Sequence, residues 1–242
     1  MTIILLLAIS FAASFVGTLA RSGGLNGMPS LLLIGPPIHQ VIGSVKFPNL
    51  FSSFSSFYIL LKKKQQKLKD ALQLIPFALF GGLCCGLLAN SFSGKAMNLL
   101  AICLLTVALI MNFIKKPQPS DETDWHLPKK VYPSLFVISV YDGMFGPGQA
   151  TMLMYTFLRN GATYLQSLAI TRFQTFISCT AAFITYSWPV KRIAIYYTFG
   201  SLIGSRLALR VAQKISTGQL RFILHSVTIA LSIQLVIRVA FP

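Results

Sequence analysis

Long stretches without charge are the feature of this sequence that most limits how it can fold. Four stretches contain no Asp, Glu, Lys or Arg, and three longer ones contain a single such residue each. The charge-free stretches are 2–20, 71–94, 96–114 and 222–237, and the singly charged ones are 22–61, 131–158 and 160–190. A helix needs about 20 apolar residues to cross the hydrocarbon core of a bilayer. The sequence therefore predicts an all-α membrane protein that crosses the bilayer several times.

Composition supports a lipid environment. Only 11% of the 242 residues are charged, whereas a soluble domain has about 25%. The net charge of +16 would suggest nucleic acid if the protein were soluble, but the basic residues cluster between apolar stretches, as in cytoplasmic loops. We therefore expect the lipid bilayer, and not nucleic acid, as the surroundings of this chain.

The chain consists of two related halves. Residues 115–130 are polar and contain three prolines, which predicts a linker between residues 1–114 and residues 131–242. When the second half is shifted back by 126 positions, a co-linear series of its residues matches residues of the first half. The matched pairs are Gly17 with Gly143, Met28 with Met154, Leu32 with Leu158, Gly35 with Gly161, Lys46 with Arg172, Phe47 with Phe173, and Ser52 with Ser178. Repeated halves are a common architecture of transporters.

Each half has the same predicted order of elements. A hydrophobic helix (2–19; 131–141) leads into a Gly-rich break (21–27; 143–148), which is followed by a short apolar segment (28–34; 149–158). Three long spans complete each half, at 41–61, 71–89 and 96–114 in the first and at 163–187, 193–209 and 221–240 in the second. The sequence leaves open whether the short segments re-enter or cross the bilayer.

Two further pairs of glycines also correspond between the halves. Gly82 and Gly86 are separated by three residues, as are Gly200 and Gly204. Small residues at this spacing let two membrane helices approach closely. We expect these glycines to form packing faces and to take no part in the chemistry.

The distribution of Lys and Arg predicts the orientation. If the linker is cytoplasmic and each short segment returns to the side it came from, the inner loops carry twelve basic residues and the outer loops three. This asymmetry follows the positive-inside rule. It requires an odd number of crossings in each half, so we expect inverted repeats, a cytoplasmic linker and both termini outside.

The paired Gly-rich breaks point to a binding site. Non-helical backbone at membrane depth persists only where protein or a water-filled cavity satisfies it. Ser22, Gly23 and Gly24 in the first break, and Gly146 and Gly148 in the second, would leave helix N-termini whose N–H groups attract anions. The alternative is that these glycines only permit close helix contact or a turn.

Three ionisable residues lie inside apolar spans. Lys46 and Arg172 occupy equivalent positions in the two halves, and we expect them to face one cavity and hold an oxyanion. The alternatives are a structural ion pair or snorkelling. Asp142 is the only acidic residue in such a span; it would pair with either cation in the absence of substrate or, as the less favoured interpretation, carry a coupling proton.

The sequence gives no sign of an enzyme, a metal site or a bound cofactor. It has neither an HExxH nor a G-x-S-x-G motif, no P-loop, and three scattered histidines. We therefore expect a secondary transporter of small anions. A membrane scaffold or accessory subunit without a transport path is the main alternative, and an intramembrane enzyme is disfavoured.

Two motifs resemble one known family. Residues 23–32, GGLNGMPSLL, resemble the Gly-rich opening motif of the sulfite exporter TauE/SafE family, and residues 141–148, YDGMFGPG, are similar to its second-half counterpart. The similarity extends over nearly the whole chain and includes residues 200–206, GSLIGSR. Arg21 and Ser22 stand where members usually have glycines, and an acidic residue often found near Gly17 is missing.

The resemblance implies a multi-pass permease of the bacterial inner membrane. Its implied substrates are sulfite, organosulfonates such as sulfoacetate, or related organic anions. It implies neither the particular substrate nor the direction of transport.

Overall fold

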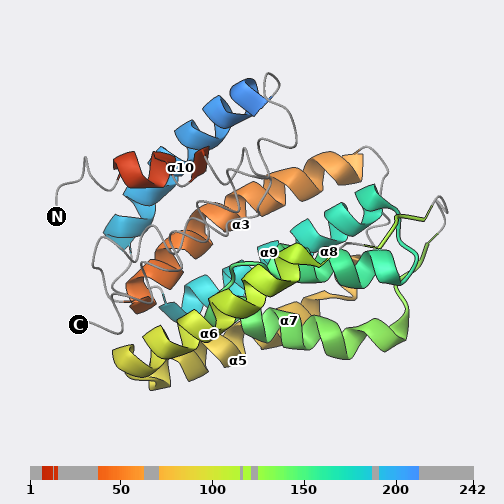
Figure 1. Ribbon diagram of the computed structural model, residues 1–242, viewed down its shortest axis with the longest axis horizontal. Coiled ribbons are helices and arrows are strands. Elements are labelled where there is room, and N and C mark those ends of the chain that lie inside the picture. The colour runs from red at the N-terminus through yellow and green to blue at the C-terminus, as the bar shows by residue number, and fades with distance from the viewer. Residues whose placement is uncertain are drawn as a thin grey trace.

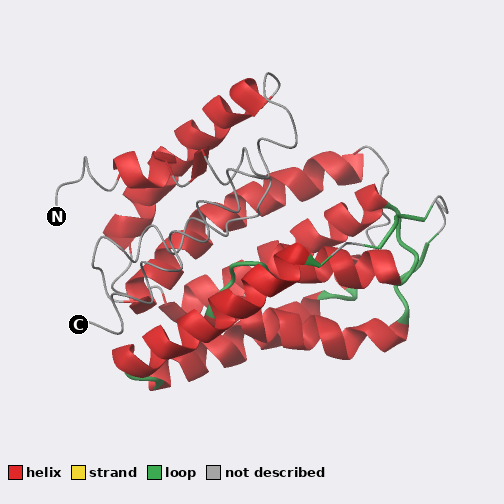
Figure 2. Cartoon of the chain, in the orientation of Figure 1, coloured by secondary structure: helices red, strands yellow, loops and turns green. Residues whose placement is uncertain are grey.

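The computed structural model describes residues 7–12, 14–15, 38–62, 71–114, 117–120, 125–186 and 191–212. Every regular element in these ranges is helical, and no strand occurs among them (Figure 2). The elements are α3 (Ile38–Lys62), α5 (Ile75–Ser91), α6 (Gly94–Phe113), the 3-10 helix η1 (Lys129–Val131), α7 (Tyr132–Met144), α8 (Gln149–Arg159), α9 (Tyr164–Tyr186) and α10 (Lys191–Ala212). Residues within 7–15 are also helical. The prediction of an all-α protein is confirmed for this part of the chain.

The predicted elements of the second half match the observed ones closely. The short apolar segment 149–158 corresponds to α8. Residues 145–148 separate α7 from α8, so the break is shorter than the predicted 143–148, because Gly143 and Met144 still belong to α7. The predicted break at 21–27, the segment 28–34 and the span 221–240 lie outside the described residues. α3 continues through Pro48 as one helix.

Helix α9 is central to the packing. α3, α5, α7 and α8 all pack against it, and α10 packs against α3 on the far side (Figure 1). Three ring contacts join α3 to α9: Phe47 with Phe183, Phe54 with Phe176 and Phe57 with Phe173. Because the residue numbers rise on α3 while they fall on α9, the two helices run antiparallel. The two halves of the sequence thus pack into each other.

The predicted small-residue contact faces are confirmed. A Cβ at Gly82 would lie 2.8 Å from the backbone oxygen of Ser178 on α9. A Cβ at Gly204 would clash with the backbone oxygen of Phe11. Only glycine lets α5 approach α9, and α10 approach the helix at 7–15, this closely.

The described part of the chain has an apolar outer surface and buries polar side chains among its apolar core residues. Large hydrophobic side chains are exposed on several helices, including Leu87 at 63%, Val137 at 64% and Phe199 at 60%. Thirteen Ser, Thr, Gln, Lys and Asp side chains are buried. Water-soluble proteins rarely expose apolar patches of this extent, so this distribution is typical of a helix bundle in lipid.

One helix among the described residues is by itself long and apolar enough to cross a membrane, Tyr164–Thr185 in α9; Ile75–Ala89 is a shorter apolar helix. The core helix of a soluble protein can meet the same criteria. The membrane assignment therefore depends on the charge-free stretches, the apolar outer surface and the family described below.

Candidate functional site

The break between α7 and α8 is built by two glycines in conformations that other residues rarely adopt. Gly146 has φ +100° and Gly148, the N-cap of α8, has φ +86°. Phe145 between the two helices is buried, and the Tyr141 hydroxyl donates to the carbonyl oxygens of Pro147 and of Leu104 on α6. The sequence Phe-Gly-Pro-Gly thus ends α7, and Tyr141 ties the turn to its surroundings.

Lys46 and Asp142 form an ion pair beside this break. The Lys46 Nζ lies 2.6 Å from Asp142 Oδ1 and also donates to the Asp142 backbone oxygen. Both side chains are 3% exposed. A buried ion pair is stable only when its charges and hydrogen-bonding groups are well matched, and here the lysine satisfies both a side chain and a carbonyl at the end of α7.

Gly146 is required for this arrangement. A Cβ at Gly146 would lie 2.8 Å from the Lys46 Nζ and 3.1 Å from Asp142 Oδ1. The glycine therefore serves two purposes, because it takes a positive φ and leaves room for the ion pair.

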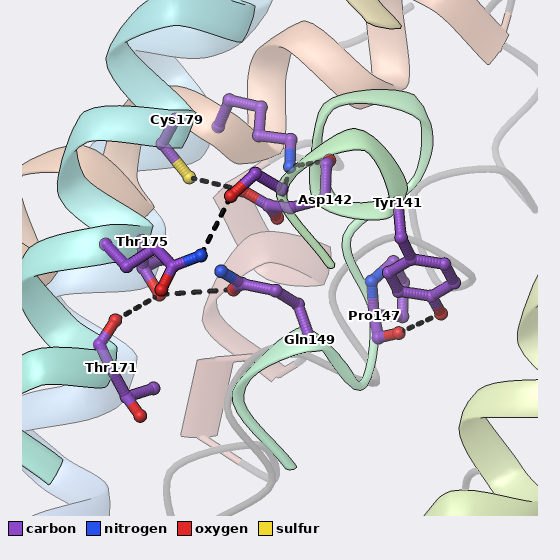
Figure 3. A network of polar contacts seen from close by, with 10 residues as sticks. Tyr141, Asp142, Pro147, Gln149, Thr171, Thr175 and Cys179 are labelled. Carbon is purple, nitrogen blue, oxygen red and sulfur yellow. Dashed lines mark hydrogen bonds and ion pairs between the residues drawn. The ribbon is translucent and has the colours of Figure 1, made fainter. Parts of the chain in front are cut away.

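A polar stripe on α9 faces the same point. Thr171, Thr175 and Cys179 follow each other at intervals of four residues, so they share one face of the helix. The Thr175 hydroxyl bonds the Thr171 carbonyl and the Gln149 Oε1 at 3.1 Å. The Cys179 thiol lies 3.9 Å from Asp142 Oδ2. Figure 3 shows Asp142 and Gln149 pointing toward this stripe.

Several buried polar atoms have no hydrogen-bond partner among the described residues, and one of them lies at the break. Gln149 is 3% exposed, and its Nε2 is one of these atoms although its Oε1 is bonded. The others are Ser44 Oγ, Ser167 Oγ, Thr171 Oγ1, Gln174 Oε1 and Ser178 Oγ. Buried polar groups are normally satisfied by protein or water. An unsatisfied amide at the N-terminus of α8 marks a place where a polar ligand would gain hydrogen bonds.

Arg172 lies on the flank of the same stripe but not at the ion pair. It precedes Thr175 by three residues and Cys179 by seven, so it shares their face of α9. Cys179, whose thiol lies 3.9 Å from Asp142 Oδ2, follows Arg172 by seven residues, about 10 Å along the helix axis. Arg172 is therefore offset along α9 from the Lys46–Asp142 pair, and the expectation that both cations face one cavity stays a prediction.

The structure thus brings together three of the predicted residues: Lys46, Asp142 and Gly146, with Gly148 capping the adjacent helix. Ser22, Gly23 and Gly24 lie outside the described residues. Sequence reasoning missed Gln149, Thr171 and Thr175. The sequence does contain a pattern that indicates them. Two threonines and a cysteine occur at intervals of four in an apolar span, and Gln149 directly follows the break. No cluster of His, Cys, Asp or Glu that would suit a metal occurs in the described ranges.

Comparisons with known proteins identify the family of the chain. The family profile described as "Sulfite exporter TauE/SafE" matches residues 6–235. A Sinorhizobium protein, "Probable membrane transporter protein ORF9", is 28% identical over 93% of this chain and 89% of its own length. A Haemophilus influenzae "Probable membrane transporter protein" is 23% identical over 86% of this chain and 84% of its own. No solved structure matches significantly.

The helices, the apolar outer surface and the buried polar break define a membrane protein of the α-helical class. Within that class, the chain belongs to the sulfite exporter TauE/SafE family, whose profile covers nearly its whole length.

Proposed function

We propose that this protein is a secondary transporter of small anions, with sulfite, organosulfonates or related organic anions as substrates. The observation that carries the proposal is the buried Lys46–Asp142 pair at a helix break lined by unsatisfied hydrogen-bond donors. The family profile and the names of the two relatives support the transport of a substrate, and the sulfite in the family description supports an oxyanion.

The chemistry of the break suits an oxyanion. Lys46 supplies a positive charge, Gln149 Nε2 and the Thr171 hydroxyl supply donors, and the N-terminus of α8 supplies a favourable dipole. In the absence of a substrate, the carboxylate of Asp142 compensates Lys46. We propose Lys46, Asp142, Gly146 and Gly148 as binding residues, together with Gln149 and Thr171.

Arg172 belongs to the other half of the site in this proposal. Arg172 corresponds to Lys46 under the shift of 126 positions, as the first break with Ser22, Gly23 and Gly24 corresponds to the second. We therefore propose that Arg172 binds the anion together with the first break. An anion that moves along the stripe of Thr171, Thr175 and Cys179 would pass from one cation to the other.

The packing favours inverted repeats. α3 and α9 correspond under the shift of 126 positions, and they run antiparallel to each other. Two contacts between the halves correspond, because α5 of the first half packs on α9 of the second as α10 of the second packs on α3 of the first. A two-fold axis in the membrane plane relates elements in this way.

The length of α8 favours a re-entrant segment. Its 11 residues span about 16 Å, well short of the roughly 30 Å hydrocarbon core. If each half crosses the membrane an odd number of times, the positive-inside rule puts the linker at 115–130 in the cytoplasm and both termini outside. We propose that the protein is a multi-pass protein of the bacterial inner membrane.

The alternative is a membrane scaffold without enzymatic activity or a transport path. The observation that favours it is that the Lys46–Asp142 pair is complete without a substrate. A scaffold, however, gains nothing from an unsatisfied Gln149 amide buried beside that pair.

Flux through proteoliposomes tests the proposal. We expect saturable uptake of at least one labelled anion from a panel of sulfite, isethionate and sulfoacetate, with chloride as the comparison. The same anion should raise the melting temperature of the purified protein, because a ligand stabilises the state that it binds. If no anion of the panel is taken up and none raises the melting temperature, the transporter proposal is wrong and the scaffold interpretation is favoured.

A further inference from the structure

The charges around Asp142 balance without a substrate. Among the described residues, Lys46 from α3 pairs with this carboxyl group, and the Cys179 thiol from α9 lies 3.9 Å from its Oδ2. Cys85 on α5 lies beside Gly143, the next residue of α7, and Gln149 on α8 is bonded to Thr175 on the same face of α9. Tyr141, next to Asp142 on α7, directs its hydroxyl to Pro147 and Leu104 instead. Lys46 is the only cation that forms an ion pair with Asp142 in the described ranges, and Arg172 precedes Cys179, the α9 residue beside this carboxyl group, by seven residues, about 10 Å along the helix axis.

We propose that a substrate anion takes the place of the Asp142 carboxylate at Lys46, and that Asp142 binds a proton as it is displaced. Anion and proton are then carried together. This inference depends on the proposed function and adds the coupling ion to it.

The argument is a balance of charge in a buried site. Lys46 and Asp142 sum to zero, so a monovalent anion that enters alone leaves one uncompensated negative charge. An unpaired buried charge costs several kcal/mol, about the value of breaking a buried ion pair. A proton on Asp142 removes that cost, because the site then holds one cation, one anion and one neutral carboxyl group.

The protonated carboxyl group has partners in place. The hydroxyl of a neutral Asp142 can donate to the bound oxyanion, and Gln149 Nε2 can donate to the anion from the other side. The proton comes from the aqueous side at which the anion enters. It leaves on the other side, where Asp142 pairs again with Lys46 as the anion departs.

One proton per monovalent anion has a quantitative consequence. Where Asp142 is ionised in the free protein and protonated in the complex, linkage makes the apparent affinity for the anion rise about tenfold for each pH unit of acidification. Transport of a monovalent anion with one proton also moves no net charge.

The experiment uses full-length protein in liposomes that contain a pH-sensitive dye. An inward gradient of isethionate is applied, because this sulfonate is fully ionised near neutral pH and brings no proton of its own. Wild-type protein should acidify the lumen with one proton for each isethionate, and an imposed membrane potential should leave the flux unchanged. Sulfoacetate, which carries two charges, should still acidify the lumen.

The Asp142→Asn variant tests whether Asp142 is the group that binds the transported proton. Isethionate flux through this variant should be lost, or should continue without acidification and without the pH dependence. Thr106→Ala on α6 is the matched control, because its hydroxyl is exposed and bonds only the Ile102 carbonyl of its own helix. If only sulfite is transported, the difference in protons per sulfite between wild type and Asp142→Asn measures the proton on Asp142.

The outcomes separate the two proposals. Flux without acidification, or acidification that persists in Asp142→Asn, overturns proton coupling and leaves the anion transporter intact. Failure of every anion in the panel to move removes the proposed function, and proton coupling with it. If Asp142→Asn fails to fold, the proton count of the wild type still decides whether a proton travels with the anion.

Discussion

Lys46 on α3 and Asp142 at the end of α7 form a buried ion pair with 2.6 Å between Nζ and Oδ1. The lysine precedes the polar linker in the sequence and the aspartate follows it, so the pair joins the two halves. It does so beside Gly146, at the point where the helical backbone is interrupted. A structural bond between the halves and the proposed anion site therefore share the same two side chains.

Removing one member of the ion pair should destabilise the protein, whereas replacing both members with apolar residues should not. Lys46→Met leaves Asp142 buried without a partner, and we expect a loss of about 3–5 kcal/mol in stability. The double variant Lys46→Met/Asp142→Leu removes both charges and should recover most of that loss, since apolar replacements of buried ion pairs are often neutral or stabilising. Thermal melting of detergent-purified protein measures both variants.

The control is Lys62→Met, because Lys62 lies in the last turn of α3, is exposed and contacts only the ring of Tyr58 on its own helix among the interactions described, with its Nζ 5.0 Å from the ring centroid. Its melting temperature should match that of the wild type. A double variant less stable than Lys46→Met would contradict the description of the pair as a charge-compensating contact.

Gly146→Ala should damage the break. The substitution is strained at φ +100°, and the new methyl group would lie 2.8 Å from the Lys46 Nζ. We expect a loss of roughly 1–3 kcal/mol from the backbone alone, with reduced anion flux. Gly94→Ala is the control, because no atom lies within 4 Å of its would-be Cβ. Equal melting temperatures for the two variants would show that Gly146 does not need its positive φ.

Arg172 should be sensitive even to a conservative change. Arg172→Lys keeps the charge but loses the planar, bidentate group that matches an oxyanion. We expect anion flux to fall about tenfold or more, the equivalent of one lost charge-assisted hydrogen bond, while the melting temperature stays near that of the wild type. Unchanged flux in Arg172→Lys would show that the guanidinium group does not bind the substrate.

Part of this architecture follows from the sequence alone. The charge-free stretches predict the helices, and the shift of 126 positions pairs the residues of α3 with those of α9. The break at 143–148 is also predictable, because Gly-Pro-Gly cannot continue a helix. The sequence also predicts that Asp142 forms an ion pair with Lys46 or Arg172, since it is the only carboxylate in an apolar span.

The choice between those cations could not be predicted. Lys46 and Arg172 have equivalent sequence environments, and which of them reaches Asp142 depends on how α3 packs against α7 and α9. The role of Gln149 could not be predicted either, because glutamine is common in the first turn of a helix and its presence there does not indicate a binding site. Only the packing shows that its Oε1 is bonded to Thr175 while its Nε2 is buried without a partner among the described residues.

Topology can be tested independently of transport. Reporter fusions near Gln65 and Ser120 should report the cytoplasm, and fusions at both termini should report the outside, as the twelve inner and three outer basic residues require. In the proposed inverted arrangement, each half crosses the membrane an odd number of times. A cytoplasmic C-terminus would contradict the inverted arrangement of the halves.

The central claim is that small anions cross the membrane through the site at Lys46 and Asp142. Its most direct test is the uptake of labelled sulfite or isethionate into proteoliposomes that contain either wild-type protein or the stable double variant Lys46→Met/Asp142→Leu. The account predicts saturable uptake by the wild type and uptake no faster than through empty liposomes for the double variant. Saturable uptake by the double variant at the wild-type rate would contradict it.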